Sequence, residues 1–300
     1  MEQGGVCMGH WVDDFWRQAA RLRGLARNPL TRGYAKRRFG RLCGTVETPA
    51  IPFDADIAGL PVSLDLKQPA DREVYLFGRG DPRGVGAIEA VMARLDCRTA
   101  WDVGTNRGIH AAFMRRHCNR LYAFEPNPVE FRRASDLLGA DDHITLLNLG
   151  LSNQDGELPF LIHSLDTGGS TFVTSATEAN FVAPVRTGDS VVAEHGVTGV
   201  DFIKIDVEGY EKNVLRGLAG TIAADRPVIV VEILAPQNSE LDNIVGLLPD
   251  YELFGNRTGF VSSILMTPYS FCPFELGKTY MSALLVPREK RDRLASLLPA

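Results

Sequence analysis

The sequence predicts an α/β fold in which a mostly parallel, Rossmann-like sheet carries helices on both faces. Three observations predict it. Short apolar runs alternate with helical patterns from residue 99 to residue 247, the first run enters a turn with two glycines, and the second ends in a glutamate. Alternating β and α units favour parallel strands joined by covering helices. Late strand candidates at 251–254, 260–265 and 281–286 favour an antiparallel edge strand.

The composition is that of an ordinary globular protein. The chain has 300 residues, of which 45% are hydrophobic and 23% charged. No run approaches the ~18 apolar residues of a membrane span, and the N-terminus lacks the pattern of a signal peptide. The five cysteines are scattered without a CxxC pair, which is typical of reduced thiols: Cys7, Cys43, Cys97, Cys118 and Cys272. We therefore expect a cytoplasmic protein.

Charge is unevenly distributed along the chain. Residues 1–48 hold nine basic and four acidic side chains, a net charge of +5, and the remaining residues carry −10. A basic segment of this kind favours contact with anionic lipid headgroups, nucleic acid or an acidic protein, although a solvated helical face has the same composition. The acidic main body argues against nucleic acid as a partner. A peripheral membrane or protein contact remains the expectation; the pattern does not indicate an oligomeric state.

The N-terminal region is predicted to stand apart from the sheet. Residues 13–42 mix apolar and basic residues with loose helical spacing, and Asn28-Pro29 and Gly33 break them into two short helices. Residues 43–70 are rich in proline and predict an irregular connector with short strands. The predicted organisation is therefore a basic helical extension and connector over 1–70, a main domain over 71–290 and a C-terminal tail over 291–300.

The elements of the main domain follow from periodicity and breakers. A hairpin-like insertion is predicted near 153–188, because the turn signals at 154–156 and 167–169 lie between short β runs at 158–162, 170–173 and 181–185. The other predicted strands are 72–77, 99–103, 121–125, 144–149, 200–205 and 228–233. The predicted helices are 86–95, 107–117, 128–138, 210–219 and 239–247.

The loop after the first regular strand indicates a cofactor site. It reads Asp102-Val-Gly-Thr-Asn-Arg-Gly108, with Thr105 and Asn106 between Gly104 and Gly108. This is neither the G-x-G-x-x-G of dinucleotide sites nor a P-loop. The loop suits a cofactor without phosphates, such as S-adenosylmethionine, whose amino-acid end would meet the backbone near Gly104 and the Asn106 side chain. A plain strand-to-helix turn is the alternative.

Two further segments extend this predicted pocket. Glu125 ends the next strand and is followed by Pro126-Asn-Pro128, so its carboxylate is expected at the edge of the sheet, where it can accept hydrogen bonds from ribose hydroxyls. The segment from Asn148 to Ser152 follows the third strand and is expected to pass beside the adenine.

The strand over 200–205 carries an unusual set of charges. Lys204, Asp206 and Glu208 alternate with apolar residues on a strand that should be central and buried, where charges need partners or a task. The carboxylates would orient a substrate hydroxyl, stabilise a sulfonium or hold a divalent metal such as Mg²⁺. Glu232, on the next strand, is expected at the same edge and joins Asp206 as a candidate metal ligand.

Five segments in order resemble the FkbM family of S-adenosylmethionine-dependent methyltransferases. They are DVGTNRG, YAFEPNP, NLGLSNQDGE, DFIKIDVEGYE and RPVIVVEI, and the resemblance covers about residues 72–235. It implies a class I methyltransferase fold and O-methylation of a hydroxyl on a sugar, glycan or secondary metabolite. By the same resemblance Gly104, Asn106 and Glu125 fall on cofactor-binding positions, and Asp206 and Glu208 fall on the family's acidic motif.

The acceptor hydroxyl must lose a proton, so a base is expected near the methyl group. Asp206, His110 and His163 are the candidates, with His110 one turn into the helix after the cofactor loop and His163 in the insertion. The stretch 167–171 is either a lid or a hairpin turn. Two other functions stay open: a nicotinamide-dependent oxidoreductase, against which the missing G-x-G-x-x-G counts, and a non-catalytic cofactor-binding module of a biosynthetic assembly.

Overall fold

The described residues of the chain belong to two units. The computed structural model describes residues 6–28, 30–44, 53–66, 68–79, 82–163, 167–232, 248, 250–256, 271–275, 280 and 282–299. Its described residues up to Val85 form one unit, the N-terminal unit, and those from Gly86 form the second, the sheet unit. The sequence analysis divides the chain earlier, after residue 70.

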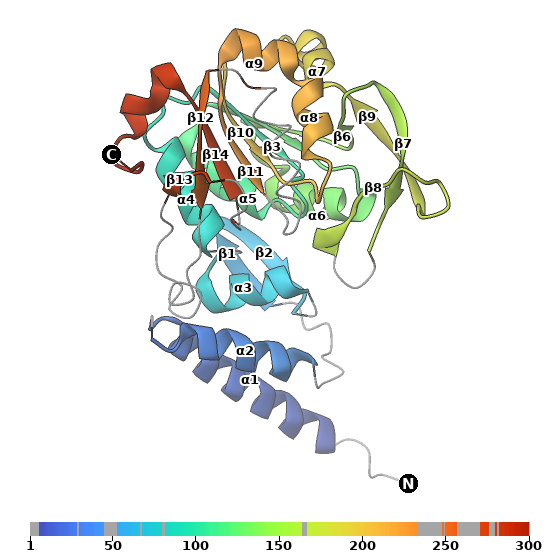
Figure 1. The fold of residues 1–300 in the computed structure, drawn as a ribbon. Helices are drawn as coiled ribbons and strands as arrows, with labels where there is room; N and C mark the ends of the chain where they lie inside the picture. Colours follow the sequence, from blue (N-terminus) through green and yellow to red (C-terminus); the bar gives the residue numbers. More distant parts are fainter. Residues whose placement is uncertain are drawn as a thin grey trace. The chain divides into compact units, whose positions relative to one another are not determined.

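The N-terminal unit is a helical hairpin with a third helix and a small β-hairpin (Figure 1). Its elements are α1 (Val6–Ala26), α2 (Arg32–Gly44), β1 (Phe53–Ile57), β2 (Leu60–Leu64) and α3 (Pro69–Phe77). The two predicted helices and the short strands of the connector are confirmed. Phe39 of α2 stacks on Tyr75 of α3 with ring centroids 5.0 Å apart, and both side chains are buried. This aromatic pair joins α2 to α3.

The strand predicted at 72–77 is wrong, because these residues belong to α3. Pro69 occupies the first helical turn, and Gly78 ends the helix with a left-handed φ of 74° while its N–H donates to the Val74 carbonyl. Pro and Gly therefore mark this helix at both ends. The apolar run between them fits either a strand or a helix. The strand prediction relied on this run and did not use the proline and the glycine at its two ends.

The sheet unit is built on an eight-stranded sheet in the order β13-β12-β14-β11-β10-β3-β4-β5. Strands β11, β10, β3, β4 and β5 run parallel to one another, and β14, β12 and β13 add antiparallel pairings at the β11 side. The strands are β3 (Thr99–Val103), β4 (Arg120–Phe124), β5 (Ile144–Leu147), β10 (Val200–Ile205), β11 (Val228–Glu232), β12 (Tyr251–Asn256), β13 (Phe271–Pro273) and β14 (Ser282–Pro287). The predicted α/β class with a mostly parallel sheet and an antiparallel edge is confirmed.

The strand order reverses between β3 and β10. Successive strands from β3 to β5 are added toward one edge of the sheet, and the step from β10 to β11 goes toward the other edge. Right-handed connections then place the two sets of helices on opposite faces. One set consists of α5 and α6, which pack on each other and on β3–β5, and the other consists of α7, α8 and α9. The helices are α4 (Pro82–Met92), α5 (Ile109–Met114), η1 (Arg115–His117), α6 (Pro128–Leu138), α7 (Gly188–His195), α8 (Glu211–Gly217) and α9 (Ala219–Asp225).

Two of these helices differ from the sequence prediction. The helix predicted over 210–219 is divided at Leu218 into α8 and α9. The sequence analysis missed α7, which begins after Thr187 because the Thr187 hydroxyl accepts a hydrogen bond from the Ser190 N–H at 3.0 Å. Threonine is a favoured N-cap, so the signal was present in the sequence.

The predicted insertion is a second sheet of four strands in the order β6-β9-β7-β8 (Figure 1). Its elements are β6 (Gly150–Leu151), β7 (Gly156–Leu161), η2 (Thr167–Gly169), β8 (Thr171–Phe172) and β9 (Phe181–Arg186). Strand β7 pairs antiparallel with both β8 and β9, which confirms a hairpin-like insertion.

The C-terminal residues belong to the sheet unit. The 3-10 helix η3 (Arg288–Leu294) follows β14, and Leu294 is fully buried, so the segment predicted as a tail is anchored by its apolar side chains. The helix predicted at 239–247 and the strand predicted at 260–265 lie outside the described residues. Within the described part of the chain, no helix combines the length and apolar character needed to cross a membrane. Among the described cysteines, Cys43, Cys97, Cys118 and Cys272 are not in disulfides.

Trp101 lies at the centre of the sheet unit's core. Its side chain is fully buried, and its ring lies 5.0 Å from the ring of Phe124 and 6.0 Å from that of Tyr122. Replacing Trp101 by alanine is therefore expected to lower the free energy of unfolding by about 3–5 kcal/mol, through lost contacts and the cavity left behind. Urea unfolding followed by circular dichroism measures it. Val182→Ala, at an exposed position of β9, is the control, and an equal effect of both would contradict the assignment of this core.

Candidate active site at the carboxyl ends of the strands

The candidate site lies where the carboxyl ends of β3 and β10 adjoin at the reversal of strand order, the position at which open α/β sheets bind ligands. Lys204 is the register partner of Asp102, and Ile205 is the partner of Val103. The Asp206 N–H then donates to the Val103 carbonyl at 3.0 Å, which extends the pairing by one residue. The acidic motif of β10 and the glycine loop of β3 are thus held together by the sheet itself.

Lys204 joins the two carboxylates of this site. Its Nζ lies 3.1 Å from Asp102 Oδ1 and 3.2 Å from Asp206 Oδ2, and it donates to the Gly104 carbonyl at 3.2 Å. Only 4% of Lys204 is exposed, and Asp102 is fully buried. Burial alone would lower the pKa of Lys204, but Asp102 and Asp206 outweigh it and raise that pKa, so the ammonium stays charged.

Asp102 is therefore a positioning residue rather than an exposed ligand. Its Oδ2 accepts a hydrogen bond from the Thr105 hydroxyl at 2.5 Å, and Thr105 is also buried. Together with Lys204, this bond fixes the start of the loop. Asp102 and Thr105 thus shape the backbone that faces the site, and the cofactor contact predicted for them stays a prediction.

Asp206 and Glu232 form a coupled carboxylate pair. Burial opposes ionisation of Asp206, but the Lys204 ammonium, a hydrogen bond from Glu232 and the charge of His110 hold its pKa below the usual range. Burial and the negative charge of Asp206 raise the pKa of Glu232 to about 9. Lys204 thus favours the ionised form of Asp206, and the charge of Asp206 favours the protonated form of Glu232.

The two glycines of the loop are required by the neighbouring protein. Gly104 has φ of 76°, and a Cβ there would lie 1.8 Å from the Asp206 carbonyl oxygen. Gly108 has φ of 88°, and its Cβ would lie 2.8 Å from Leu138 Cδ1. The atoms that would meet a Cβ at these two positions belong to the residue after β10 and to α6. Contact of the two glycines with a cofactor stays a prediction. Their conformation still sets the path of the loop.

Glu125 is oriented by two backbone donors. Its Oε2 accepts from the Asn106 N–H at 2.7 Å, and its Oε1 accepts from the Asn127 N–H at 2.8 Å. Asn106 has a left-handed φ of 50°, which turns this N–H toward the carboxylate. Only 6% of Glu125 is exposed, and burial, partly offset by these two hydrogen bonds, raises its pKa to about 7. The structure thus joins the glycine loop to the acid at the end of β4, as the sequence predicted.

The residues after β5 support the site in two ways. The Asn148 side-chain amide donates to the Glu125 carbonyl at 2.7 Å, so it holds the turn after β4. Ser152 is fully buried, and its hydroxyl lies 3.0 Å from the Tyr210 hydroxyl. Their predicted contact with an adenine stays a prediction.

The insertion contacts the loop that carries the acidic motif. The Thr171 hydroxyl of β8 donates to the Val207 carbonyl at 3.2 Å, and the rings of Phe172 and Tyr210 lie 4.9 Å apart. A Cβ at Gly150 would lie 2.5 Å from the Phe172 ring, so this side chain is tightly enclosed. His163, by contrast, is exposed on the insertion. The role of lid stays a prediction for the stretch 167–171, and the structure adds that its β8 end is attached to the site.

The other two catalytic candidates are half-buried beside this cluster. Glu208 has a left-handed φ of 56° and precedes Gly209, whose φ is 101°, so the chain turns sharply directly after β10. The charge of Glu208 contributes to the raised pKa of Glu232, and the charge of His110 to the lowered pKa of Asp206. Both candidates therefore lie within electrostatic reach of the Asp206–Glu232 pair.

The donor set is a poor fit for a divalent metal. Asp206 and Glu232 affect each other's ionisation, but the Lys204 ammonium already neutralises charge beside Asp206, and burial and the Asp206 charge raise the pKa of Glu232. Among the described residues, no group of three or more His, Cys, Asp or Glu side chains could hold a metal ion. Oxygen-ligated cations in proteins usually take more carboxylate or carbonyl ligands than this pair supplies.

Sequence reasoning did not assign a role to Lys204 or Tyr210. The signal for Lys204 was the K-x-D pattern on a strand that had to be central, because a lysine buried there requires an acidic partner. Its partner Asp102 lies about a hundred residues away and is found only from the strand pairing. Tyr210 follows Glu208 and Gly209 and gave no signal of its own.

Comparison with known proteins identifies the family. The profile of the methyltransferase FkbM domain matches residues 102–258, which include the glycine loop, Glu125 and the acidic motif of β10. The chain belongs to the FkbM family of S-adenosylmethionine-dependent methyltransferases. The resemblance drawn from the five sequence segments is confirmed.

Three curated relatives are methyltransferases. The hexuronic acid methyltransferase AglP of Haloferax volcanii is 34% identical over 131 residues, and the alignment covers 43% of this chain and 54% of the relative. The 2-O-methyltransferase NoeI of Sinorhizobium fredii is 27% identical, with 51% and 71% covered. Methyltransferase sdnD of Sordaria araneosa is 28% identical, with 39% and 59% covered. The chain thus spans about half of the length of the first of these relatives.

Solved structures include distant likenesses. The methyltransferase FkbM of Methylobacillus flagellatus has a TM-score of 0.42 at 19% identity, with 63% of this chain and 43% of that chain covered. An O-methyltransferase of Bacillus cereus in complex with SAH has a TM-score of 0.40 at 12% identity, with 68% and 80% covered.

Replacing Lys204 by methionine tests the ion-pair cluster. Removing the ammonium leaves Asp102 charged, buried and unpaired, so the free energy of unfolding is expected to fall by about 3–5 kcal/mol. The double variant Lys204→Met/Asp102→Asn should recover part of this loss, because it removes the stranded charge. Chemical unfolding at pH 7 measures both. Lys212→Met, at a half-buried position of α8, is the control, and a loss in the control as large as that in Lys204→Met would contradict the cluster.

Proposed function

We propose that this protein transfers a methyl group from S-adenosylmethionine to a hydroxyl oxygen of a sugar or glycan. The main support is that the glycine loop, Glu125 and the Asp206–Glu232 pair lie at the same edge of the sheet. Family membership supports the reaction class. The names of two relatives, a hexuronic acid methyltransferase and a 2-O-methyltransferase, support a sugar hydroxyl as the acceptor.

The cofactor would lie along the loop from Gly104 to Asn106 and reach Glu125. A buried carboxylate with two fixed backbone donors can still accept hydrogen bonds from two ribose hydroxyls through its remaining lone pairs. The half-buried Asn106 side chain and the Gly104 backbone would face the amino-acid end. When bound, S-adenosylmethionine supplies an electrophilic methyl group on a sulfonium.

Asp206 is the best-supported proton acceptor. A base must carry no proton at working pH, and Lys204 keeps Asp206 ionised while Glu232 retains the pair's proton. The acceptor hydroxyl would give up its proton to Asp206 as its oxygen attacks the methyl group. Glu208 and His110 would bind the acceptor or tune Asp206, since both lie within reach of its charge. In-line positioning of oxygen and methyl supplies much of the rate.

Cofactor affinity is expected to depend on the ionisation of Glu125. With a pKa of about 7, the carboxylate gains a proton below neutral pH and then accepts ribose hydrogen bonds less well. Affinity for S-adenosylmethionine should therefore rise from pH 6 to pH 8. Glu125→Gln should bind about 10- to 100-fold more weakly at pH 8 and lose this pH dependence. Isothermal titration calorimetry measures both, with Glu178→Gln, an exposed change in the insertion, as the control.

Transfer of a labelled methyl group to uronic-acid-containing saccharides tests the proposed reaction. Asp206→Asn should lower kcat by about 100-fold or more while S-adenosylmethionine still binds, because a general base contributes about this factor. Asp136→Asn, at an exposed position of α6, should leave turnover unchanged. Binding of NADH with no binding of S-adenosylmethionine would contradict the proposed function.

Chelation separates the two possible roles of the carboxylate pair. Because the donor set fits a shared proton better than a cation, turnover is expected to survive EDTA. Loss of turnover on chelation, with recovery on adding Mg²⁺, would instead favour the metal-ligand role predicted for Asp206 and Glu232.

A further inference from the structure

The N-terminal unit carries a dense positive charge. Residues 14–44 contain nine Arg and Lys side chains and a single acidic one, Asp14, which gives this stretch a net charge of +8. The whole chain has a net charge of −5, so the positive charge is confined to one part of the molecule. A local concentration of this kind creates a surface potential that attracts anions over about a Debye length.

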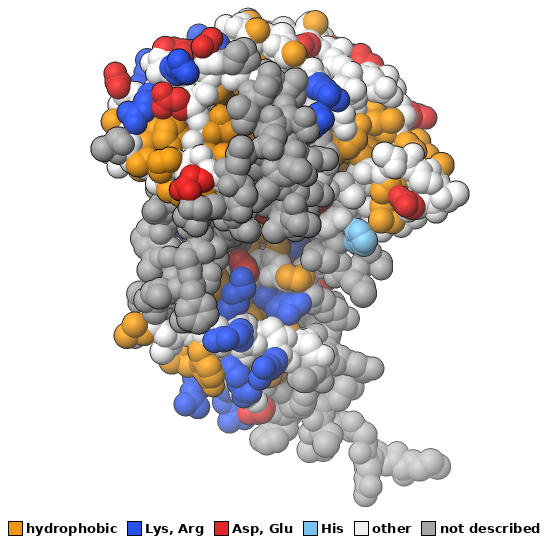
Figure 2. Space-filling model, viewed as in Figure 1, with side chains coloured by type: hydrophobic (Ala, Val, Ile, Leu, Met, Phe, Trp, Pro, Cys, Tyr) orange, Lys and Arg blue, Asp and Glu red, His pale blue; other side chains and the backbone are white. Residues whose placement is uncertain are grey.

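Most of these basic side chains point to solvent. Helices α1 and α2 use their apolar positions for packing: Phe15, Ala19, Ala35 and Phe39 are buried. Seven of the nine basic residues are exposed, namely Arg17, Arg21, Arg27, Lys36, Arg37, Arg38 and Arg41. Figure 2 displays Lys and Arg side chains gathered over this unit. The core of the unit is thus complete without them.

Two large apolar side chains are exposed among these charges. Leu30, in the turn between α1 and α2, is 73% exposed, and Tyr34, in the first turn of α2, is 53% exposed. Neither has a place in the core formed by Phe39 and Tyr75. A leucine and a tyrosine that project beside arginines match the side chains that enter the headgroup region of a bilayer, where an amphipathic ring and a short apolar chain are both accommodated.

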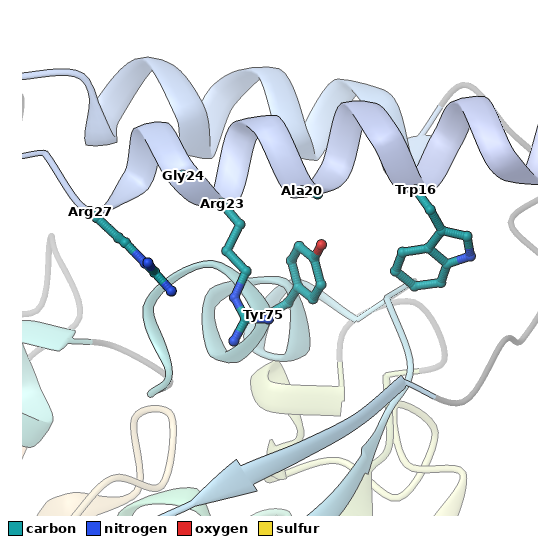
Figure 3. Close-up of a pocket in the computed structure, with 6 residues that line it drawn as sticks. All are labelled: Trp16, Ala20, Arg23, Gly24, Arg27 and Tyr75. Carbon is teal, nitrogen blue, oxygen red and sulfur yellow. The ribbon is translucent and has the colours of Figure 1, made fainter.

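The same unit contains two adjoining arginine-lined cavities. One has a volume of about 500 Å³, and its lining residues are Trp16, Ala20, Arg23, Gly24, Arg27 and Tyr75 (Figure 3). The other, of about 450 Å³, shares Arg23 and Arg27 with the first and adds Arg32 and Arg79, with no acidic side chain in its lining. Guanidinium groups bind phosphate oxygens through two parallel hydrogen bonds. These cavities therefore suit phosphate-bearing headgroups.

We propose that the N-terminal unit docks the protein on a membrane surface rich in anionic phospholipids. The exposed arginines of α1 and α2 attract the surface, Arg23 and Arg27 bind lipid phosphates, and Leu30 and Tyr34 enter the headgroup region. Each basic residue near an anionic bilayer adds to the attraction, so a cluster of this size is sufficient for reversible binding. Two kinds of signal, charge and apolar insertion, act together here, as stable peripheral binding requires.

Nucleic acid fits the patch less well. The phosphates of a nucleic acid would account for the exposed arginines, but they would not account for the exposed leucine near them in the sequence. The lipid surface accounts for both the charges and the apolar side chains. Binding to RNA is accordingly the outcome that the experiment below sets against it.

Vesicle co-sedimentation of the full-length protein tests the proposal. Binding is expected to vesicles of phosphatidylcholine mixed with phosphatidylglycerol, but not to vesicles of phosphatidylcholine alone, and it should weaken as salt is raised. The triple variant Arg37→Glu/Arg38→Glu/Arg41→Glu should partition at least about 10-fold more weakly. Leu30→Ser/Tyr34→Ser should also weaken binding, with the salt dependence unchanged.

A matched control distinguishes the effect of the arginines of the N-terminal unit from the effect of net charge. Arg116→Glu/Arg120→Glu/Arg132→Glu makes the same change in net charge at exposed positions of the sheet unit and should bind vesicles like the unmodified protein. All substitutions are at exposed sites, and thermal melting verifies that each variant is folded. Three outcomes would overturn the proposal. The protein could bind neutral and anionic vesicles equally, or the two triple variants could lose the same amount of vesicle binding. The protein could also bind a double-stranded RNA oligonucleotide and fail to bind vesicles. Methyl transfer does not enter the measurement, so the two proposals stand or fall separately.

Discussion

The buried ammonium of Lys204 is the interaction on which the site depends. A lysine in the centre of a parallel sheet is costly unless its charge is compensated, and here Asp102 and Asp206 lie within 3.2 Å of it. Its third contact, to the Gly104 carbonyl, fixes the first residue of the glycine loop. One side chain thus sets the loop conformation, the separation of two strand ends and the ionisation of the neighbouring carboxylate.

This arrangement gives each acid at the sheet edge a different protonation state. Asp206 is kept ionised by Lys204, Glu232 is kept protonated by burial and by Asp206, and Glu125 has a pKa of about 7 in its own buried position. Three carboxylates at one edge of the sheet are therefore shifted differently: the pKa of Asp206 is lowered, and those of Glu232 and Glu125 are raised. Methyl transfer to a hydroxyl needs little more from the protein than such an acceptor and accurate positioning.

The two units differ in the kind of charge that they carry. The sheet unit concentrates buried acids around a cofactor loop, and the N-terminal unit concentrates exposed arginines on α1 and α2. Packing explains how both can coexist in one chain. The buried apolar side chains of α1 and α2 pack within their own unit, where Phe39 stacks on Tyr75, and most of the basic side chains of these helices are exposed.

Local sequence determined the elements, the fold class and most of the site. Three features could be predicted because each depends on neighbouring residues: the alternation of strands and helices, the Gly104 turn and the glutamate at the end of β4. The order of five segments was enough to indicate the family.

Only the tertiary structure decided which charges meet. The partners of Lys204 lie on two elements, and the space beside Gly104 belongs to the Asp206 carbonyl rather than to a ligand. The strand predicted at 72–77 was wrong for a related reason: a short apolar run is compatible with both periodicities, and its end caps decided the outcome. Pairing across a sheet joins residues about a hundred positions apart, and no local pattern encodes that distance.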